Sequence, residues 1–291
     1  MHQLQNRGRT SVSVRLRRQV QALHRTLDRN AAALAAAVTP SAIHNTRVAA
    51  RRLRVLLDVY EREFDSKRAK RYRRELKLLS RDLEPAREAD VMRHVIAQVA
   101  KNRDGTISRD SRALYLRAKD QYAAAIHGLR LTIGSARWLQ SLTDLRHLTG
   151  LSPLVKENTA VTARVMDRLV KRRRQRLRGA LNRVGRNPKR IHKIRLKVKA
   201  MRYLLESCLS KSAIATSLEL KRLRQIQTGL GEMHDEENLL EFLSAEPRHR
   251  EAAREVCKQL KTRKGRHFRV FKGHRKELMR LWASAAFHQA V

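Results

Sequence analysis

Apolar residues recur every three or four positions along most of this chain, which is the period of an amphipathic helix. No stretch shows the two-residue alternation of a half-buried strand, and only 11 glycines and 5 prolines interrupt 291 residues. The pattern therefore predicts an all-α fold. The expected helices span residues 10–38, 39–64, 66–83, 87–101, 108–133, a shorter segment from 137, 158–184, 187–210, 213–230, 233–243 and 246–291.

The segment 39–64 carries the most informative pattern. Thr39 can cap the free amides of a helix, and Pro40 suits its first turn. Basic residues then follow at steps of three, four and three, so they share one stripe: His44, Arg47, Arg51 and Arg54. Apolar residues border this stripe on both sides: Ala50, Leu53, Leu57, Tyr60, Phe64, and Val48, Val55 and Val59. A basic strip enclosed by apolar surface is expected to point into a groove or cavity.

The same device occurs a second time, after Asn187 and Pro188. The second stripe has the same steps: His192, Arg195, Lys199 and Arg202. A cap, a proline, a histidine and three cations repeated in one register indicate an internal duplication. The loop at residues 150–153 is the predicted boundary, which gives a single domain over 1–291 with helical halves at 10–150 and 153–288.

Cations also align on the helix that follows each stripe. Arg74 and Lys77 belong to the row Lys70, Arg74, Lys77 and Arg81, and Lys221 and Arg224 stand at the matching places in the second half. The densest run of charge, KRRRQRLR from Lys171 to Arg178, is open to two interpretations: a solvated helix face or a nonspecific polyanion patch.

Charge then narrows the class of partner. Lys and Arg total 66 against 27 Asp and Glu, a formal net charge of +39, which implies an anionic partner. Nucleic acid, an acidic membrane surface or an inorganic polyanion would each satisfy that charge. Binders of single-stranded nucleic acid interleave aromatic residues with cations so that bases can stack, and the aromatic content here is 4%. The composition therefore favours a polyanion without bases.

No stretch has the pattern of a signal peptide or a membrane span, so a cytoplasmic protein without a membrane partner is expected. Cys208 and Cys257 are expected to be reduced packing residues.

Two pairs of motifs, in order, resemble the CHAD family, the conserved-histidine α-helical domain: IHNTRVAARRLRVLL from Ile43, LEPAREADV from Leu83, IHKIRLKVKAMRYLL from Ile191 and LGEMHDEENLL from Leu230. The resemblance covers nearly the whole chain. It implies two pseudo-symmetric four-helix bundles that enclose a basic pore or groove and bind inorganic polyphosphate. It also implies the residues that face the pore: His44, Arg47, Arg51, Arg54, Arg74, Lys77, His192, Arg195, Lys199, Arg202, Lys221 and Arg224.

Two positions depart from the family's pattern or from the repeat. Glu88 stands where the family usually has Asp, which keeps the charge and changes its reach. Ala200 stands where the first copy has Arg52, so Arg52 is expected to be a surface or half-specific contact rather than a shared ligand.

Three functions follow as hypotheses. The first is a noncatalytic polyphosphate-binding protein without a cofactor, recruited to polyphosphate granules and their proteins. The second is an architectural protein that binds nucleic acid nonspecifically. The third is a metal-dependent phosphohydrolase that uses His44, His192, His234 and nearby carboxylates. The residues around the second motif stay open between carboxylates that cap helices or hold arginines and a metal or acid–base site: Arg87, Glu88, Asp90, His234, Asp235 and Glu237.

Overall fold

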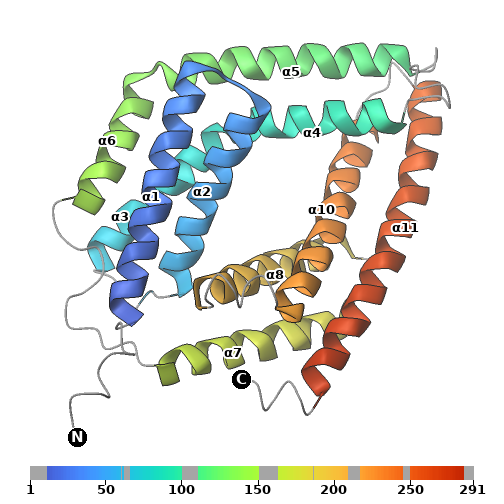
Figure 1. Cartoon of the computed structure of the whole chain (residues 1–291). Helices are drawn as coiled ribbons and strands as arrows, with labels where there is room; N and C mark the ends of the chain where they lie inside the picture. Colours follow the sequence, from blue (N-terminus) through green and yellow to red (C-terminus); the bar gives the residue numbers. More distant parts are fainter. Residues whose placement is uncertain are drawn as a thin grey trace, which may run out of the picture. The chain divides into compact units, whose positions relative to one another are not determined.

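The computed structural model describes residues 12–59, 61, 66–99, 111–150, 163–185, 187–208, 217–244 and 250–284. All regular structure within these residues is helical, which confirms the all-α prediction (Figure 1). The helices are α1 (Val12–Ala36), α2 (Pro40–Val59), α3 (Ser66–Asp82), α4 (Glu84–Val99), α5 (Arg112–Ile133), α6 (Ala136–Gly150), α7 (Ala163–Asn182), α8 (Pro188–Cys208), α10 (Leu218–Ser244) and α11 (Arg250–Ala283).

The chain divides into two compact units that do not follow one cut along the sequence. Unit 1 comprises Met1–Arg87 and Ala125–Lys171, and unit 2 comprises Glu88–Ala124 and Arg172–Val291. The divisions fall within α4, α5 and α7. The division of the duplication into halves at 10–150 and 153–288 stays a prediction.

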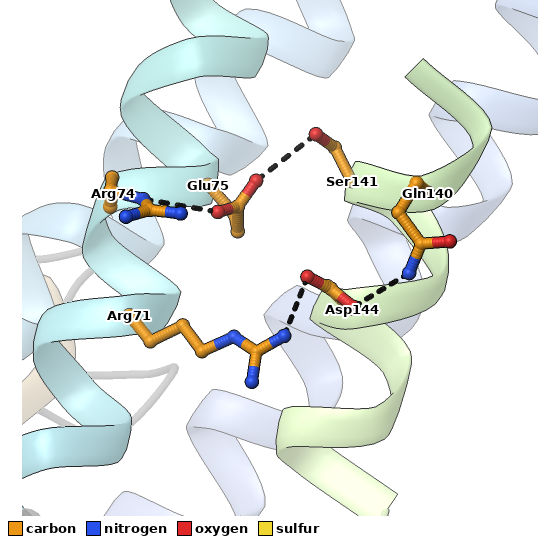
Figure 2. A network of polar contacts seen from close by, with 6 residues as sticks. All are labelled: Arg71, Arg74, Glu75, Gln140, Ser141 and Asp144. Carbon is orange, nitrogen blue, oxygen red and sulfur yellow. Dashed lines mark hydrogen bonds and ion pairs between the residues drawn. The ribbon is translucent and has the colours of Figure 1, made fainter. Parts of the chain in front are cut away.

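In unit 1, α1 packs against α2, α2 against α3, and both α3 and α1 against α6 (Figure 1). Their interior contains the buried Leu27, Leu53 and Leu76. One buried polar pair lies in this core, where His24 Nδ1 is 2.8 Å from the hydroxyl of Tyr72. Polar contacts join α3 to α6 at the edge of the core: Arg71 donates to Asp144 at 2.8 Å, and Ser141 donates to the buried Glu75 at 3.0 Å (Figure 2).

In unit 2, α10 packs against both α8 and α11. One core cluster contains Ile96, Leu114, Leu239 and Leu260, so helices from distant parts of the sequence share it. A second contact fixes α11 by its last turn, where Trp282 Nε1 donates to the buried Glu219 of α10 at 2.7 Å. The Trp282 side chain itself is buried.

The predicted caps are confirmed. The Thr39 hydroxyl accepts from the amide of Ala42 at 3.1 Å, and Asn187 Oδ1 accepts from the amide of Arg190 at 3.2 Å. Each cap satisfies a backbone donor that the first turn leaves without a helical partner. Both basic stripes therefore begin at a defined helix end.

Two predicted helix boundaries are wrong. The glycines at 229 and 231 do not end a helix, because α10 runs through them from Leu218 to Ser244. Gly229 is buried against α11, and a Cβ there would lie 3.8 Å from Phe271 Cβ. Likewise α4 begins at Glu84 rather than near Arg87, because a proline is tolerated in a first turn. The stretch 102–107, between the expected helices 87–101 and 108–133, lies outside the described residues.

Candidate functional site

The first basic stripe lies along α2 in unit 1, and we call His44, Arg47, Arg51 and Arg54 the His44 stripe. His44 is exposed, whereas the three arginines are half-buried. Partial burial of its ring lowers the pKa of His44, and the positive charges of Arg87, Arg51 and Arg47 lower it further. These cations are therefore close enough to the imidazole to repel its protonated form. Arg87, from the second motif, is a member of the site that spacing on α2 could not reveal.

One arginine of this stripe is already in an ion pair with a carboxylate. Arg47 Nη2 donates to Glu84 Oε1 at 2.6 Å, and the Arg47 side chain is 11% exposed. Glu84 lies in the first turn of α4, where the helix dipole favours a negative charge. Two buried N–H groups have no hydrogen-bond acceptor among the described residues, Nη1 of Arg47 and Nε of Arg54. Such donors suit a ligand rich in oxygen.

Arg74 and Lys77 lie on the exposed face of α3. The Arg74 side chain is 74% exposed, and its Nε lies 3.4 Å from Glu75 Oε1, so it points toward the Glu75–Ser141 contact (Figure 2). Lys77 has no ion pair among the residues that the structure describes. These two predicted site residues thus lie on α3, which packs against α2, and no contact between them and the His44 stripe is described.

The second stripe lies along α8 in unit 2, and we call His192, Arg195, Lys199 and Arg202 the His192 stripe. Burial again lowers the pKa of His192, with further lowering by Arg195 and Lys199. The His192 ring meets the ring of His234 edge-on, with centroids 5.1 Å apart. His234 stands in its motif where Arg87 stands in the first motif, so corresponding residues accompany both stripe histidines.

A shared carboxylate brings α10 into the second stripe. Glu206 Oε1 lies 3.7 Å from Arg202 Nε and 3.3 Å from Arg224 Nη2. Glu206 therefore connects Arg224 of α10 with Arg202 of the His192 stripe. Lys199 is only 7% exposed, and Lys221 is exposed on α10 without an ion pair among the described residues.

The charged run from Lys171 to Arg178 has mixed roles. Arg172 and Arg176 are exposed. Arg174, in contrast, makes a bidentate contact with the buried Glu219: its Nε donates to Oε1 at 3.1 Å and its Nη2 donates to Oε2 at 3.0 Å. Leu177 within the run is buried. Neither interpretation of the run as a uniform surface is correct for the whole segment.

Two carboxylates of the second motifs pair with cations, which favours a role in holding basic side chains over a metal or acid–base site. Asp90 accepts from Arg93 at 3.1 Å, and Glu237 pairs with Lys264. No group of three or more His, Cys, Asp or Glu side chains within the described ranges is arranged to hold a metal ion. His234, Asp235 and Glu237 lie inside the continuous α10, so they cannot cap a helix start.

Comparison with known proteins gives the family. The model of the CHAD domain matches residues 18–244, which is most of the chain. The protein belongs to the CHAD family. No curated protein matches the sequence.

Two solved structures share the CHAD fold of this chain. The crystal structure of the CHAD domain from the plant Ricinus communis has a TM-score of 0.71 at 19% identity and covers 92% of each chain. PptA from Streptomyces chartreusis has a TM-score of 0.68 at 16% identity and covers 94% of this chain and 100% of its own. At these identities the likeness concerns the fold alone. No helix in the described part of this CHAD protein is long and apolar enough to cross a membrane.

Proposed function

We propose that this CHAD protein binds inorganic polyphosphate, without catalysing its breakdown, through the His44 and His192 stripes. One observation carries the proposal: in both units a histidine and three cations share one stripe of a helix, and partial burial first and nearby cations second lower the pKa of that histidine. Both stripes therefore gather positive charge around one imidazole. The family's link to polyphosphate, implied by the four motifs, names the anion. The basic pore implied by the same resemblance stays a prediction.

The chemistry of the donors suits phosphate chains. Arginine presents a planar fork that matches two phosphate oxygens, and lysine supplies a mobile point charge. The buried N–H groups of Arg47 and Arg54 that have no acceptor among the described residues offer donors to such oxygens. Aromatic side chains, which would stack nucleic acid bases, make up 4% of the sequence.

Binding of a long polyphosphate, measured by filter retention or gel retardation, tests the proposal. The variant Arg51→Gln with Arg195→Gln removes one cation from each stripe. The control, Arg172→Gln with Arg176→Gln, removes the same charge from exposed positions of α7. We expect the stripe variant to bind roughly tenfold more weakly and the control less than threefold, because charge-assisted hydrogen bonds are lost only in the stripes. Equal losses would show that bulk charge alone decides the affinity.

Two further assays on the same protein distinguish the proposal from its two alternatives. If duplex DNA competes with polyphosphate equally per phosphate, the protein is a general polyanion binder, and the proposed selectivity for polyphosphate over nucleic acid is wrong. Phosphate release from polyphosphate with added Mg²⁺, Mn²⁺ or Zn²⁺ would instead indicate a phosphohydrolase. Recruitment to polyphosphate granules is part of the proposal, and a fluorescent fusion carrying Arg51→Gln and Arg195→Gln should leave the granules.

A further inference from the structure

A second row of cations follows the exposed face of α11 in unit 2. It consists of residues at helical spacing, and we call it the α11 row: Arg254, Lys258, Lys261, Arg269, Lys272, Lys276 and Arg280. All seven side chains are exposed. Thr262, Gly265, Met279 and Ala283 also fall within this arc, and the exposed Glu277, next to Lys276, lies on its flank, where it pairs with Arg222 and His274.

Cations on the flank of α11 that faces α10 are paired with carboxylates. Arg263 lies 3.4 Å from Glu236, Lys264 pairs with Glu237, and His267 Nδ1 lies 3.0 Å from Glu236, so the flank facing α10 is neutralised. No residue of the α11 row has a carboxylate partner among the described residues. Packing against α10 explains these contacts, whereas the contact described for the row is that of Lys272, whose Nζ lies over the ring of Phe268, 5.8 Å from its centroid.

The shape of the row selects its ligand. From Arg254 to Arg280 it extends over about 39 Å along one straight helix face. A flexible phosphate chain can follow such a line. A strand of duplex DNA cannot, because it turns once around its axis within roughly 34 Å. The row contains no aromatic side chain for bases, and the apolar face of α11, including Phe271 and Leu278, is buried rather than available to a lipid surface.

We propose that the α11 row is a second polyphosphate-binding surface, which engages chains long enough to occupy the His192 stripe of the same unit as well. This inference rests on the proposed function. A chain held at one site meets the other at a high effective concentration, so affinity should rise with chain length. Short chains should bind through the stripes alone.

Gly265 allows the row to be tested without removing any contact. A Cβ at this position would meet nothing within 4 Å, so side chains can be added in the middle of the row. Gly265→Glu introduces an opposing charge, and Gly265→Gln is its neutral match of similar size and helix propensity. A stronger variant replaces Lys258, Lys261, Lys272 and Lys276 by Gln.

Affinities for short and long polyphosphate are then compared at fixed salt. We expect the four-lysine variant to bind long chains roughly tenfold more weakly and short chains less than twofold more weakly. Gly265→Glu should weaken long-chain binding relative to Gly265→Gln. Unchanged long-chain affinity, or equal losses for both lengths, would overturn the inference. A larger loss for duplex DNA, or for vesicles containing phosphatidylserine, than for polyphosphate would assign the row to that partner instead.

Failure of this inference is distinguishable from failure of the proposed function. If Arg51→Gln with Arg195→Gln weakens binding of both chain lengths while the row variants weaken neither, only the inference is wrong. If the unaltered protein binds neither length, the proposed function is wrong and the α11 row has no polyphosphate to bind.

Discussion

The two stripe histidines combine exposure to neighbouring cations with partial burial, and both effects favour the neutral imidazole. Their pKa values are lowered from the ordinary 6.5. A bound polyanion would offset the repulsion from Arg51 and Lys199 and raise both pKa values again. Binding should therefore take up protons.

The pH dependence follows from that sign. We expect polyphosphate affinity to increase as pH falls from about 7 through the range below 6.5, because the bound state gains protons there. Titration calorimetry in buffers of different ionisation enthalpy measures the uptake. The variant His44→Gln with His192→Gln should flatten the profile. An unchanged profile would show that the histidines do not titrate with binding.

Glu206 gives a second test at the scale of single residues, because it lies beside both Arg202 and Arg224. Glu206→Gln should strengthen polyphosphate binding roughly three- to tenfold by releasing both guanidinium groups. Glu241→Gln, at an exposed position of α10, changes the net charge equally and is the control. Weaker binding by Glu206→Gln would mean that this carboxylate positions the arginines.

The sequence predicted the stripe residues because spacing along one helix fixes which side chains share a face. It could not predict which residue from another helix meets each histidine. Arg87 and His234 were visible only as corresponding positions in a motif, and their approach to His44 and His192 depends on packing between helices.

At the scale of elements, Arg174 joins α7 to α10 rather than forming a ligand surface. Glu219 is 6% exposed and accepts from both Arg174 and Trp282. Arg174→Gln would leave this carboxylate buried without its cation, which should cost about 3 kcal/mol of unfolding free energy. Arg172→Gln, two residues away and exposed, should change the unfolding free energy by less than about 0.5 kcal/mol. Thermal unfolding followed by circular dichroism compares the two, and equal midpoints would contradict the role of this contact.

Gly229 shows why the sequence misplaced a helix end. Glycine often ends helices, but here it lies in the middle of α10 at the contact with Phe271 of α11. An added methyl group would make ordinary contact, so Gly229→Ala should stabilise the protein by roughly 0.5–1 kcal/mol through helix propensity. Gly229→Leu should instead cost about 1–3 kcal/mol by crowding α11, unlike Gly265→Leu in open space. Destabilisation of both leucine variants to the same extent would refute the crowding.

At the scale of the whole molecule, the net charge of +39 affects folding and binding in opposite ways. Salt screens the repulsion among cations, so raising NaCl from 0.1 to 0.5 M should raise the unfolding midpoint of the free protein. The same change should weaken polyphosphate binding by roughly a hundredfold or more if at least about four phosphates are held at once. Scanning calorimetry and binding isotherms over one salt series measure both. An affinity independent of salt would rule out a mainly ionic complex.

The fold class was accessible from the sequence because its apolar period is helical nearly throughout. The assignment of helices to two compact units was not, since the divisions fall inside α4, α5 and α7 where no turn residue marks them. The pattern instead predicted a boundary at 150–153, between the repeated motifs in the sequence.

Arg47, Arg202 and Arg224 are already paired with carboxylates of the protein, so an anionic ligand has to compete with Glu84 and Glu206 for them. The free energy that one phosphate group gains on binding is therefore only the difference between its contact with the arginine and the contact that Glu84 or Glu206 already makes. For a single orthophosphate this difference is small, whereas a polymer adds it over many linked groups while its chain entropy is lost once. The resident carboxylates would thus keep the site clear of abundant monovalent and divalent anions and leave it open to the polymer.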